Sequence, residues 1–115
     1  MLVKTFCAAV NGMQVTTVTV EVSSVIGDKL FLSGLADNAV REAQSRIFSA
    51  ITNIGMQYPM KRITVNLAPA DIRKEGSAFD LPIAIGILAS DGKITNERLH
   101  GQMMIGELGL DGSIK

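Results

Sequence analysis

The first third of the chain alternates hydrophobic and polar residues in the manner of β-strands. In the stretch VTTVTVEV, valines occupy every second position from 18 to 22, with threonine or glutamate between them. This pattern is typical of a strand that buries one face. Asn11-Gly12 is the preferred centre of a tight hairpin turn, and Gly27-Asp28 marks a second turn. We therefore predict strands over residues 2–10, 14–23 and 29–34.

A helical period follows. Asp37 is a good N-cap for a helix over residues 38–54, and Gly55 is a good terminator. Arg46 lies on the predicted solvent side of this helix. The predicted apolar stripe recurs at spacings of three and four and comprises Val40, Ala43, Ile47, Ile51 and Ile54. The sequence RITVNL then predicts a strand over residues 62–67.

The stretch KEGSAFDLPIAIGILAS, residues 74–90, joins a charged glycine loop to an almost wholly apolar segment. Periodicity alone allows strand or helix over 81–90, but Gly86, the two alanines and Pro82 favour a buried helix. The N-cap is placed near Asp80, whose carboxylate would accept from the N–H of Ile83, and Ser77 with Asp80 also resembles a capping box. We therefore interpret Gly76, Ser77 and Asp80 as a structural helix-capping loop.

Beyond the turn Asp91-Gly92, residues 103–108 are predicted as a strand. Asp111-Gly112 predicts another hairpin, whose returning strand begins at 113–115. The predicted order is β-β-β-α-β-α-β, an α+β fold in which two main helices cover one face of a mixed sheet in a two-layer sandwich. A chain ending so soon after a strand begins is expected to be a fragment truncated at its carboxy-terminal end.

Composition narrows the class of protein. The 115 residues, 47% hydrophobic and 19% charged, suit one domain, residues 1–115. The longest apolar run, about ten residues, is too short to span a bilayer. Eleven basic and eleven acidic residues cancel, which argues against a strongly electrostatic nucleic-acid binder. Cys7 is the single cysteine, as expected in a reducing cytoplasm.

Three stretches closely resemble one family. These are GLADNAVREAQSRI, KRITVNLAPADIRKEGSAFDLPIAIGILAS and GELGLDGSIK, which together cover much of the chain. They resemble the amino-terminal domain of the ComM/YifB family of magnesium-chelatase-like AAA+ ATPases. The resemblance implies a Lon-protease-like fold (also described as ribosomal-protein-domain-2-like), shared with a domain of the RadA recombination factor.

The same resemblance implies a non-catalytic accessory domain that serves an AAA+ motor of the same chain. The motor, absent from these residues, would use ATP and magnesium and would assemble as a homo-oligomeric ring. The ComM branch resembles a branch-migration helicase of DNA recombination in natural transformation. This domain would then assist assembly or guide DNA or a protein partner, with no membrane partner. The segment itself is predicted to carry no catalytic, cofactor or metal site.

Two alternatives remain open, a residual Lon-type Ser/Lys peptidase and a magnesium chelatase subunit. Aligned with Lon through Gly76, Ala78 takes the place of the nucleophile and Ser77 falls one residue early. Asp80 would disfavour an oxyanion there. The Lon lysine would lie beyond Lys115, and Lys74 is a poor replacement because nothing in its loop indicates burial.

Other candidates carry weaker signals. Lys61, Arg62, Arg73 and Lys74 flank the predicted fourth strand and are candidates for weak phosphate or partner contacts. His100 is the only histidine and has no metal-ligand spacing to Cys7. The chain contains no Gly-x-x-x-x-Gly-Lys-Ser/Thr phosphate loop.

Overall fold

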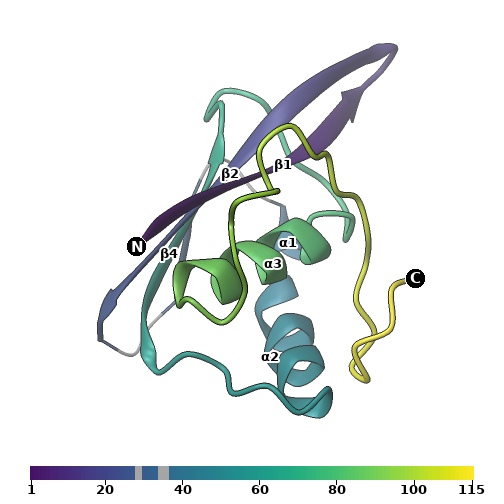
Figure 1. Cartoon of the computed structure of the whole chain (residues 1–115). Coiled ribbons are helices and arrows are strands. Elements are labelled where there is room, and N and C mark those ends of the chain that lie inside the picture. Colours follow the sequence, from purple (N-terminus) through teal and green to yellow (C-terminus); the bar gives the residue numbers. More distant parts are fainter. Residues whose placement is uncertain (28–29, 34–36) are drawn as a thin grey trace.

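A four-stranded mixed sheet forms one layer of the molecule (Figure 1). The computed structural model describes residues 1–27, 30–33 and 37–115. Strand β1 (Leu2–Asn11) pairs antiparallel with β2 (Gln14–Ile26), and β2 pairs antiparallel with β4 (Lys61–Ala68). Strand β3 (Leu30–Ser33) lies parallel to β4, which gives the order β1-β2-β4-β3. Of the predicted strand 29–34, residues 29 and 34 lie outside the described residues.

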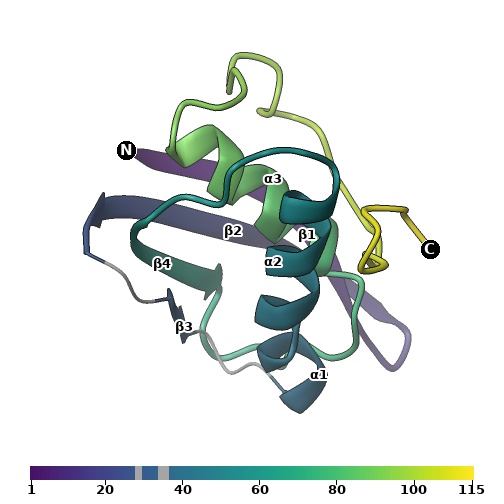
Figure 2. The same ribbon diagram turned by 90° about the horizontal axis from the view of Figure 1, so that it is seen from below.

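The helices form the second layer on one face of this sheet (Figures 1 and 2). They are α1 (Asn38–Arg41), α2 (Ala43–Asn53) and α3 (Asp80–Ser90). Helix α3 packs against β1 and β2, and α2 packs against α3. The fold is thus a small α+β structure, as the alternation of sequence periods predicts.

One hydrophobic core lies between the two layers. Strands β1, β2 and β4 contribute alternate residues to it, since successive side chains of a strand point to opposite faces. The helices contribute the apolar stripe of α2 and nearly all of α3. Among the side chains that the structure describes, the largest fully buried apolar ones are Phe79, Ile47, Ile51, Ile63, Leu67, Ile87, Val18, Val20, Val22, Val40 and Val65. The predicted buried face of 14–23 is therefore confirmed.

The predicted helix over 38–54 is interrupted once. Asp37 caps it as predicted, because its Oδ1 accepts from the N–H of Val40 at 2.9 Å. Glu42 separates α1 from α2, and Gly55 follows α2 with φ of +91°. The prediction was wrong for one residue of the apolar stripe. Ile54 is 54% exposed; it is the C-cap, one residue beyond the last residue of α2.

The predicted helix at 81–90 is confirmed and the strand alternative is wrong. Pro82 lies in the first turn of α3, where its missing N–H is not required. A Cβ at Gly86 would lie 2.5 Å from Val22 Cγ2, so glycine permits the close approach of α3 to β2. The sheet also holds α3 by hydrogen bonds from Thr5 Oγ1 to the Pro82 carbonyl (2.8 Å) and from Ser24 Oγ to the Ser90 carbonyl (2.9 Å).

The predicted strand at 103–108 was wrong. The structure has only two isolated bridges there, Phe6 with Met103 (parallel) and Leu108 with Ile114 (antiparallel). Between them, the Met104 N–H donates to the Phe6 carbonyl of β1 at 2.8 Å, but the next backbone hydrogen bonds go to the segment at the start of α3 instead of a strand. Gly106 donates to the Ala78 carbonyl at 2.9 Å and accepts from the N–H of Leu81 at 3.0 Å.

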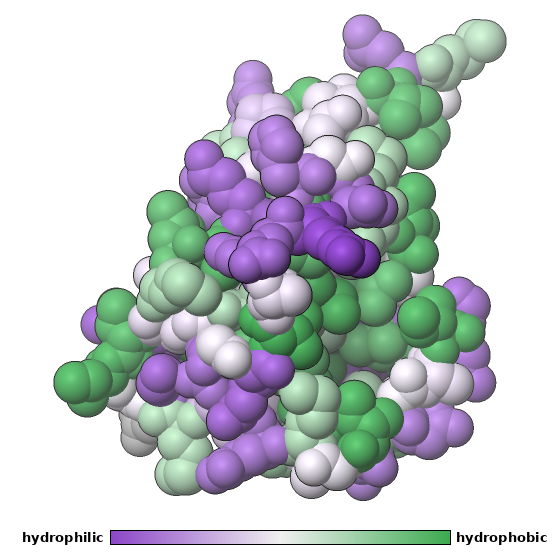
Figure 3. All heavy atoms as spheres, in the orientation of Figure 1, coloured by the Kyte–Doolittle hydropathy of each residue, from purple (hydrophilic) through white to green (hydrophobic). Residues whose placement is uncertain are grey.

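The tip of the β1–β2 hairpin projects from the body (Figures 1 and 3). This arm accounts for the elongated shape, 39 Å along one axis and 26 Å along the other two. Val10, Met13 and Val15 are exposed at its tip. None of the helices in the described ranges has the length and hydrophobicity that a membrane span requires.

Candidate functional site

The loop of residues 74–80 lies between the amino ends of two helices. Its backbone is bonded to Asp37, the residue that caps α1. The Asp37 N–H donates to the Lys74 carbonyl at 3.2 Å, and Asp37 Oδ2 accepts from the N–H of Gly76 at 3.2 Å. Gly76 has φ of +83°, a conformation that glycine adopts without strain. The loop is therefore fixed to the start of α1 before α3 begins.

A buried ion pair joins this loop to α2. Arg46 Nε lies 2.7 Å from Asp80 Oδ2, and Arg46 Nη2 lies 2.9 Å from Asp80 Oδ1, so the pair is bidentate. The Asp80 side chain has no exposed surface, whereas 22% of the Arg46 side chain is exposed. The N–H of Leu108 also donates to Asp80 Oδ2 at 3.1 Å. The hydrogen bond to Asp80 raises the pKa of Arg46, so the guanidinium stays charged.

The predicted capping role of Ser77 and Asp80 was therefore wrong in its geometry. The N-cap of α3 is Phe79, and no side chain caps the helix. The Ile83 N–H donates to the Phe79 carbonyl at 3.1 Å, not to Asp80, because the carboxylate is occupied by Arg46 and Leu108. Ser77 takes part through its carbonyl, which accepts from the Asp80 N–H at 3.2 Å.

Lys74 was also misjudged. Nothing in the loop's residues indicated burial, yet the residue is 0% exposed, and its ammonium donates to the carbonyl of Pro69. Burial lowers the pKa of Lys74, and the charge of Asp71 opposes this in part. The cation thus lies inside the loop that connects β4 to α3 and cannot serve as a surface contact for phosphate.

The four basic candidates do not form one patch. Lys61 and Arg62 are at the start of β4, while Arg73 and Lys74 follow its end. From Arg62 to Ala68 the strand extends roughly 20 Å, and the Lys74 ammonium donates to Pro69 just beyond its end. Lys61 Nζ lies 2.8 Å from Asp91 Oδ1, and Arg73 Nε lies 2.9 Å from Glu75 Oε1 in an exposed pair.

The single histidine and the single cysteine lie in different environments. Cys7 is buried in the core, and burial raises the pKa of its thiol. The ring of His100 meets that of Phe6 edge to face, with centroids 6.1 Å apart. Among the described residues, no group of three or more His, Cys, Asp or Glu side chains could hold a metal ion.

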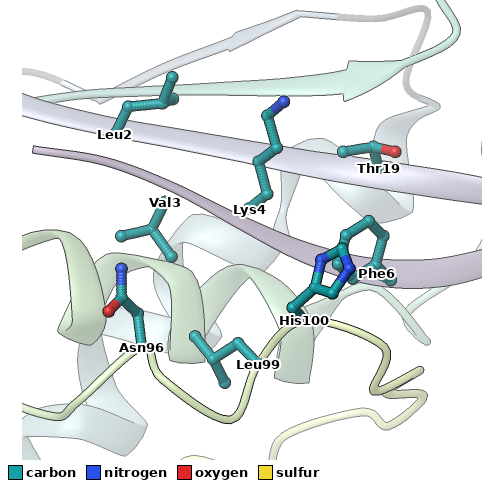
Figure 4. Close-up of a pocket in the computed structure, with 8 residues that line it drawn as sticks. All are labelled: Leu2, Val3, Lys4, Phe6, Thr19, Asn96, Leu99 and His100. Atoms are coloured by element: carbon teal, nitrogen blue, oxygen red, sulfur yellow. The ribbon is translucent and has the colours of Figure 1, made fainter.

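A groove runs beside β1. It has a volume of about 520 Å³, and its walls come from β1, β2 and the loop before Met103 (Figure 4). The lining residues are Leu2, Val3, Lys4, Phe6, Thr19, Asn96, Leu99 and His100. Sequence analysis missed this groove, because nothing in the chain's local pattern indicates that residues 96–100 lie against the first strand.

The arrangement of the loop supports a structural task. Asp80 and Arg46 join three distant segments, α2, α3 and the strand-free stretch 104–108. Sequence analysis placed Arg46 on the solvent side of its helix and so missed it. The available signal was Asp80 itself, since a carboxylate entering a wholly apolar segment requires a cation or several donors.

Comparisons with known proteins identify relatives over most of the chain. The model of the family described as subunit ChlI of Mg-chelatase matches residues 18–115. The chain is 47% identical over 111 residues to the competence protein ComM of Haemophilus influenzae, covering 96% of this chain and 22% of that protein. It is 44% identical over 108 residues to the uncharacterized protein YifB of Escherichia coli K12, covering 93% and 21%.

A more distant relative is an uncharacterized protein of Mycobacterium tuberculosis H37Rv, 36% identical over 113 residues, covering 97% of this chain and 22% of the relative. The chain belongs to the Mg-chelatase-like family that includes ComM and YifB. It spans about one fifth of the length of the curated relatives it matches.

Proposed function

We propose that this chain is a non-catalytic accessory domain of a ComM-like AAA+ ATPase of the cytoplasm, and that the domain has the Lon-like fold. It helps to assemble a ring or guides DNA or a protein partner to the motor, which uses ATP and magnesium. The similarity to a competence protein over 96% of this chain supports a place in DNA recombination. The motor domain of the same chain is then its first partner.

The observation that carries the non-catalytic role is the Asp80–Arg46 pair. The loop at the amino end of α3 is where a Lon-like nucleophile and its oxyanion would lie. There the chain has a buried carboxylate held by both of its oxygens. The Arg46 guanidinium and the Leu108 N–H, which could otherwise stabilise an oxyanion, are bonded to this carboxylate instead. The same pair makes the loop a rigid junction, which suits a domain that transmits position to a neighbour.

The test uses the full-length protein that carries these residues, compared with a version lacking residues 1–115. Three quantities are measured: ATP hydrolysis, ring formation by mass photometry, and branch migration of a four-way DNA junction. We expect the shortened protein to keep ATP hydrolysis and to lose ring formation or branch migration. A shortened protein that matches the intact one in all three would contradict the accessory role.

One observation favours the second candidate, a Ser/Lys peptidase. The buried Lys74, with its lowered pKa, is closer to a usable general base than its loop position suggested. A fluorophosphonate probe separates the two readings, because it labels an activated serine. We expect no labelling of Ser77, and no peptide cleavage in either the parent chain or Ser77→Ala. Labelling that disappears in Ser77→Ala would establish the peptidase.

A further inference from the structure

Strand β1 leaves part of its outer edge open. The Phe6 carbonyl accepts from the N–H of Met104 at 2.8 Å, so Phe6 faces away from β2. Met1, of opposite parity, presents its carbonyl to the N–H of Ser24 on β2. Backbone groups alternate in direction along a strand, so Leu2 and Lys4 face outward like Phe6. Among the described residues, neither of them pairs with another strand on that side.

The groove of about 520 Å³ lies along this open edge (Figure 4). Leu99 and Asn96 form its far wall, and the ring pair Phe6–His100 lies at one end. Two backbone hydrogen bonds shape the wall, from Leu99 to the Asn96 carbonyl (3.3 Å) and from Gln102 to the Leu99 carbonyl (3.2 Å). The space is therefore bordered by an edge strand on one side and an apolar side chain on the other.

The charged residues on the outer face of the sheet indicate which kind of side chain a ligand should place beside β1. Lys4 is opposite Glu21 on β2, and Glu21 is opposite Asn66 on β4. The Glu21 carboxylate accepts from Asn66 Nδ2 at 2.7 Å, and Lys4 makes no ion pair with any described residue. A further strand beside β1 would place a side chain next to Lys4, where an acidic residue continues the alternation of charge.

We propose that this groove binds an extended peptide segment of a partner protein, which adds a strand to the open edge of β1. Its backbone pairs with Leu2 and Lys4. An acidic side chain lies opposite Lys4 on the outer face, and the apolar residues on either side of it point toward Leu99. This is recognition by strand addition, in which the backbone supplies affinity and alternate side chains supply specificity. The proposal goes beyond the accessory role and stands independently of it.

Two features exclude simpler readings of the edge. A lysine alone is a common guard against unwanted strand pairing, but a guard needs no wall such as Leu99 across a groove. A second copy of this chain is a poor occupant. The stretch open to a second copy is short, because Met104 already occupies the Phe6 carbonyl, and the antiparallel register centred on Lys4 places Lys4 against Lys4, which is unfavourable.

The experiment uses the palindromic peptide acetyl-Thr-Val-Glu-Val-Thr-amide, which presents the same side chains in either strand direction. Its affinity for the chain is measured by NMR titration and compared with that of the peptide with lysine at the centre. We expect the glutamate peptide to bind roughly three- to tenfold more tightly. The Leu2 and Lys4 amides should become protected from exchange, and a peptide N-methylated at its three central residues should not bind.

Variants of the protein give the second arm. Lys4→Glu should reverse the preference between the two peptides, whereas Lys115→Glu, the same charge change elsewhere, should leave it intact. Leu99→Ala should weaken both peptides. The proposal is overturned if neither peptide binds at millimolar concentration, or if Lys4→Glu leaves the order of affinities unchanged. The proposal is also overturned if the chain dimerises in the absence of peptide and the Lys4 amide becomes protected from exchange, because a second copy would then occupy the edge of β1.

Discussion

Asp80 is a charged side chain with no exposed surface, which is costly unless every lone pair is used. Here two guanidinium hydrogen bonds and one backbone N–H meet the carboxylate. Arg46 has a further bond to the Ala39 carbonyl at 2.8 Å and keeps contact with water. The two partners therefore differ in what each would lose if the other were removed.

Arg46→Met should cost more stability than Asp80→Asn. Without Arg46, an ionised carboxylate is left buried and uncompensated, a change that typically costs about 3–5 kcal/mol. Asparagine at position 80 keeps an acceptor for the Leu108 N–H, and Arg46 can reach solvent, so we expect about 1–3 kcal/mol. Urea unfolding at pH 7 gives both values. Arg98→Met, which changes an exposed arginine, should be close to neutral.

The double variant tests the pair directly. Because each single change breaks the same interaction, their combined cost should be smaller than the sum of the two. Additive costs, or equal costs for the two single variants, would contradict the assignment of a buried pair with one exposed partner.

Lys74 should give stability an alkaline pH dependence. Burial lowers its pKa from the ordinary value of 10.5, so between the two values the unfolded chain binds the proton more strongly than the folded chain. Stability of the parent relative to Lys74→Met should therefore rise as pH increases toward 10.5 and level off above it. Burial raises the pKa values of Cys7 and Tyr58, so these groups also make stability depend on pH. Both are present in both proteins, and their contributions cancel in the difference.

The measurement is urea unfolding of both proteins at a series of pH values from 7 to the alkaline limit of the fold. Lys115→Met, which removes an exposed lysine, should show no such trend relative to the parent. A difference between parent and Lys74→Met that stays flat over the alkaline range would show that Lys74 is not held in a desolvated place.

Individual residues show where the sequence was sufficient and where it was not. Asp37 and Gly55 were predicted correctly because capping depends on local backbone groups. The environment of Arg46 was predicted wrongly because its burial depends on Asp80, 34 residues away in the sequence. That of Lys74 was predicted wrongly because its burial depends on the path of the loop that carries it. Local patterns contain no information on such contacts.

At the scale of elements, the contact between α3 and β2 is set by Gly86. An alanine there would place its Cβ 2.5 Å from Val22 Cγ2 and 3.3 Å from Val22 Cβ, and that stiff side chain is fully buried. Gly86→Ala should therefore destabilise the fold by about 1–3 kcal/mol. This would hold although alanine favours a helix by about 1 kcal/mol over glycine.

Val22→Ala provides the matched variant, because it removes the methyl group that alanine 86 would meet. In the double variant, the cost of Gly86→Ala should fall or change sign, which thermal unfolding of the four proteins measures. If Gly86→Ala stabilises the chain that keeps Val22, then α3 and β2 can move apart without loss of stability. The close contact at Gly86 would then not be required by the fold.

The elements also show the limit of periodicity. Strong patterns predicted β1, β2, β4 and α3, since burial of one face or of all faces appears directly in the residue types. The stretch 103–108 reads as a strand equally well, yet its backbone hydrogen bonds are divided among Phe6, the loop at Ala78 and the carboxylate of Asp80, so no continuous strand pairing forms. Tertiary structure decides which partner a backbone segment bonds to. The groove beside β1 could not be predicted for the same reason, because its walls come from segments distant in the sequence.

For the molecule as a whole, the expected division of labour is that nucleotide chemistry belongs to the motor and not to this domain. The chain lacks a phosphate loop; Gly106 is bonded to Ala78 and Leu81, and Gly109 donates to the Ser113 carbonyl. We therefore expect the 115-residue chain to bind no ATP, with or without magnesium, by isothermal calorimetry at micromolar concentration. The full-length protein serves as the positive control under the same conditions. Saturable binding to the chain alone would show that this domain contributes a nucleotide site, and the accessory role would have to be replaced by a catalytic one.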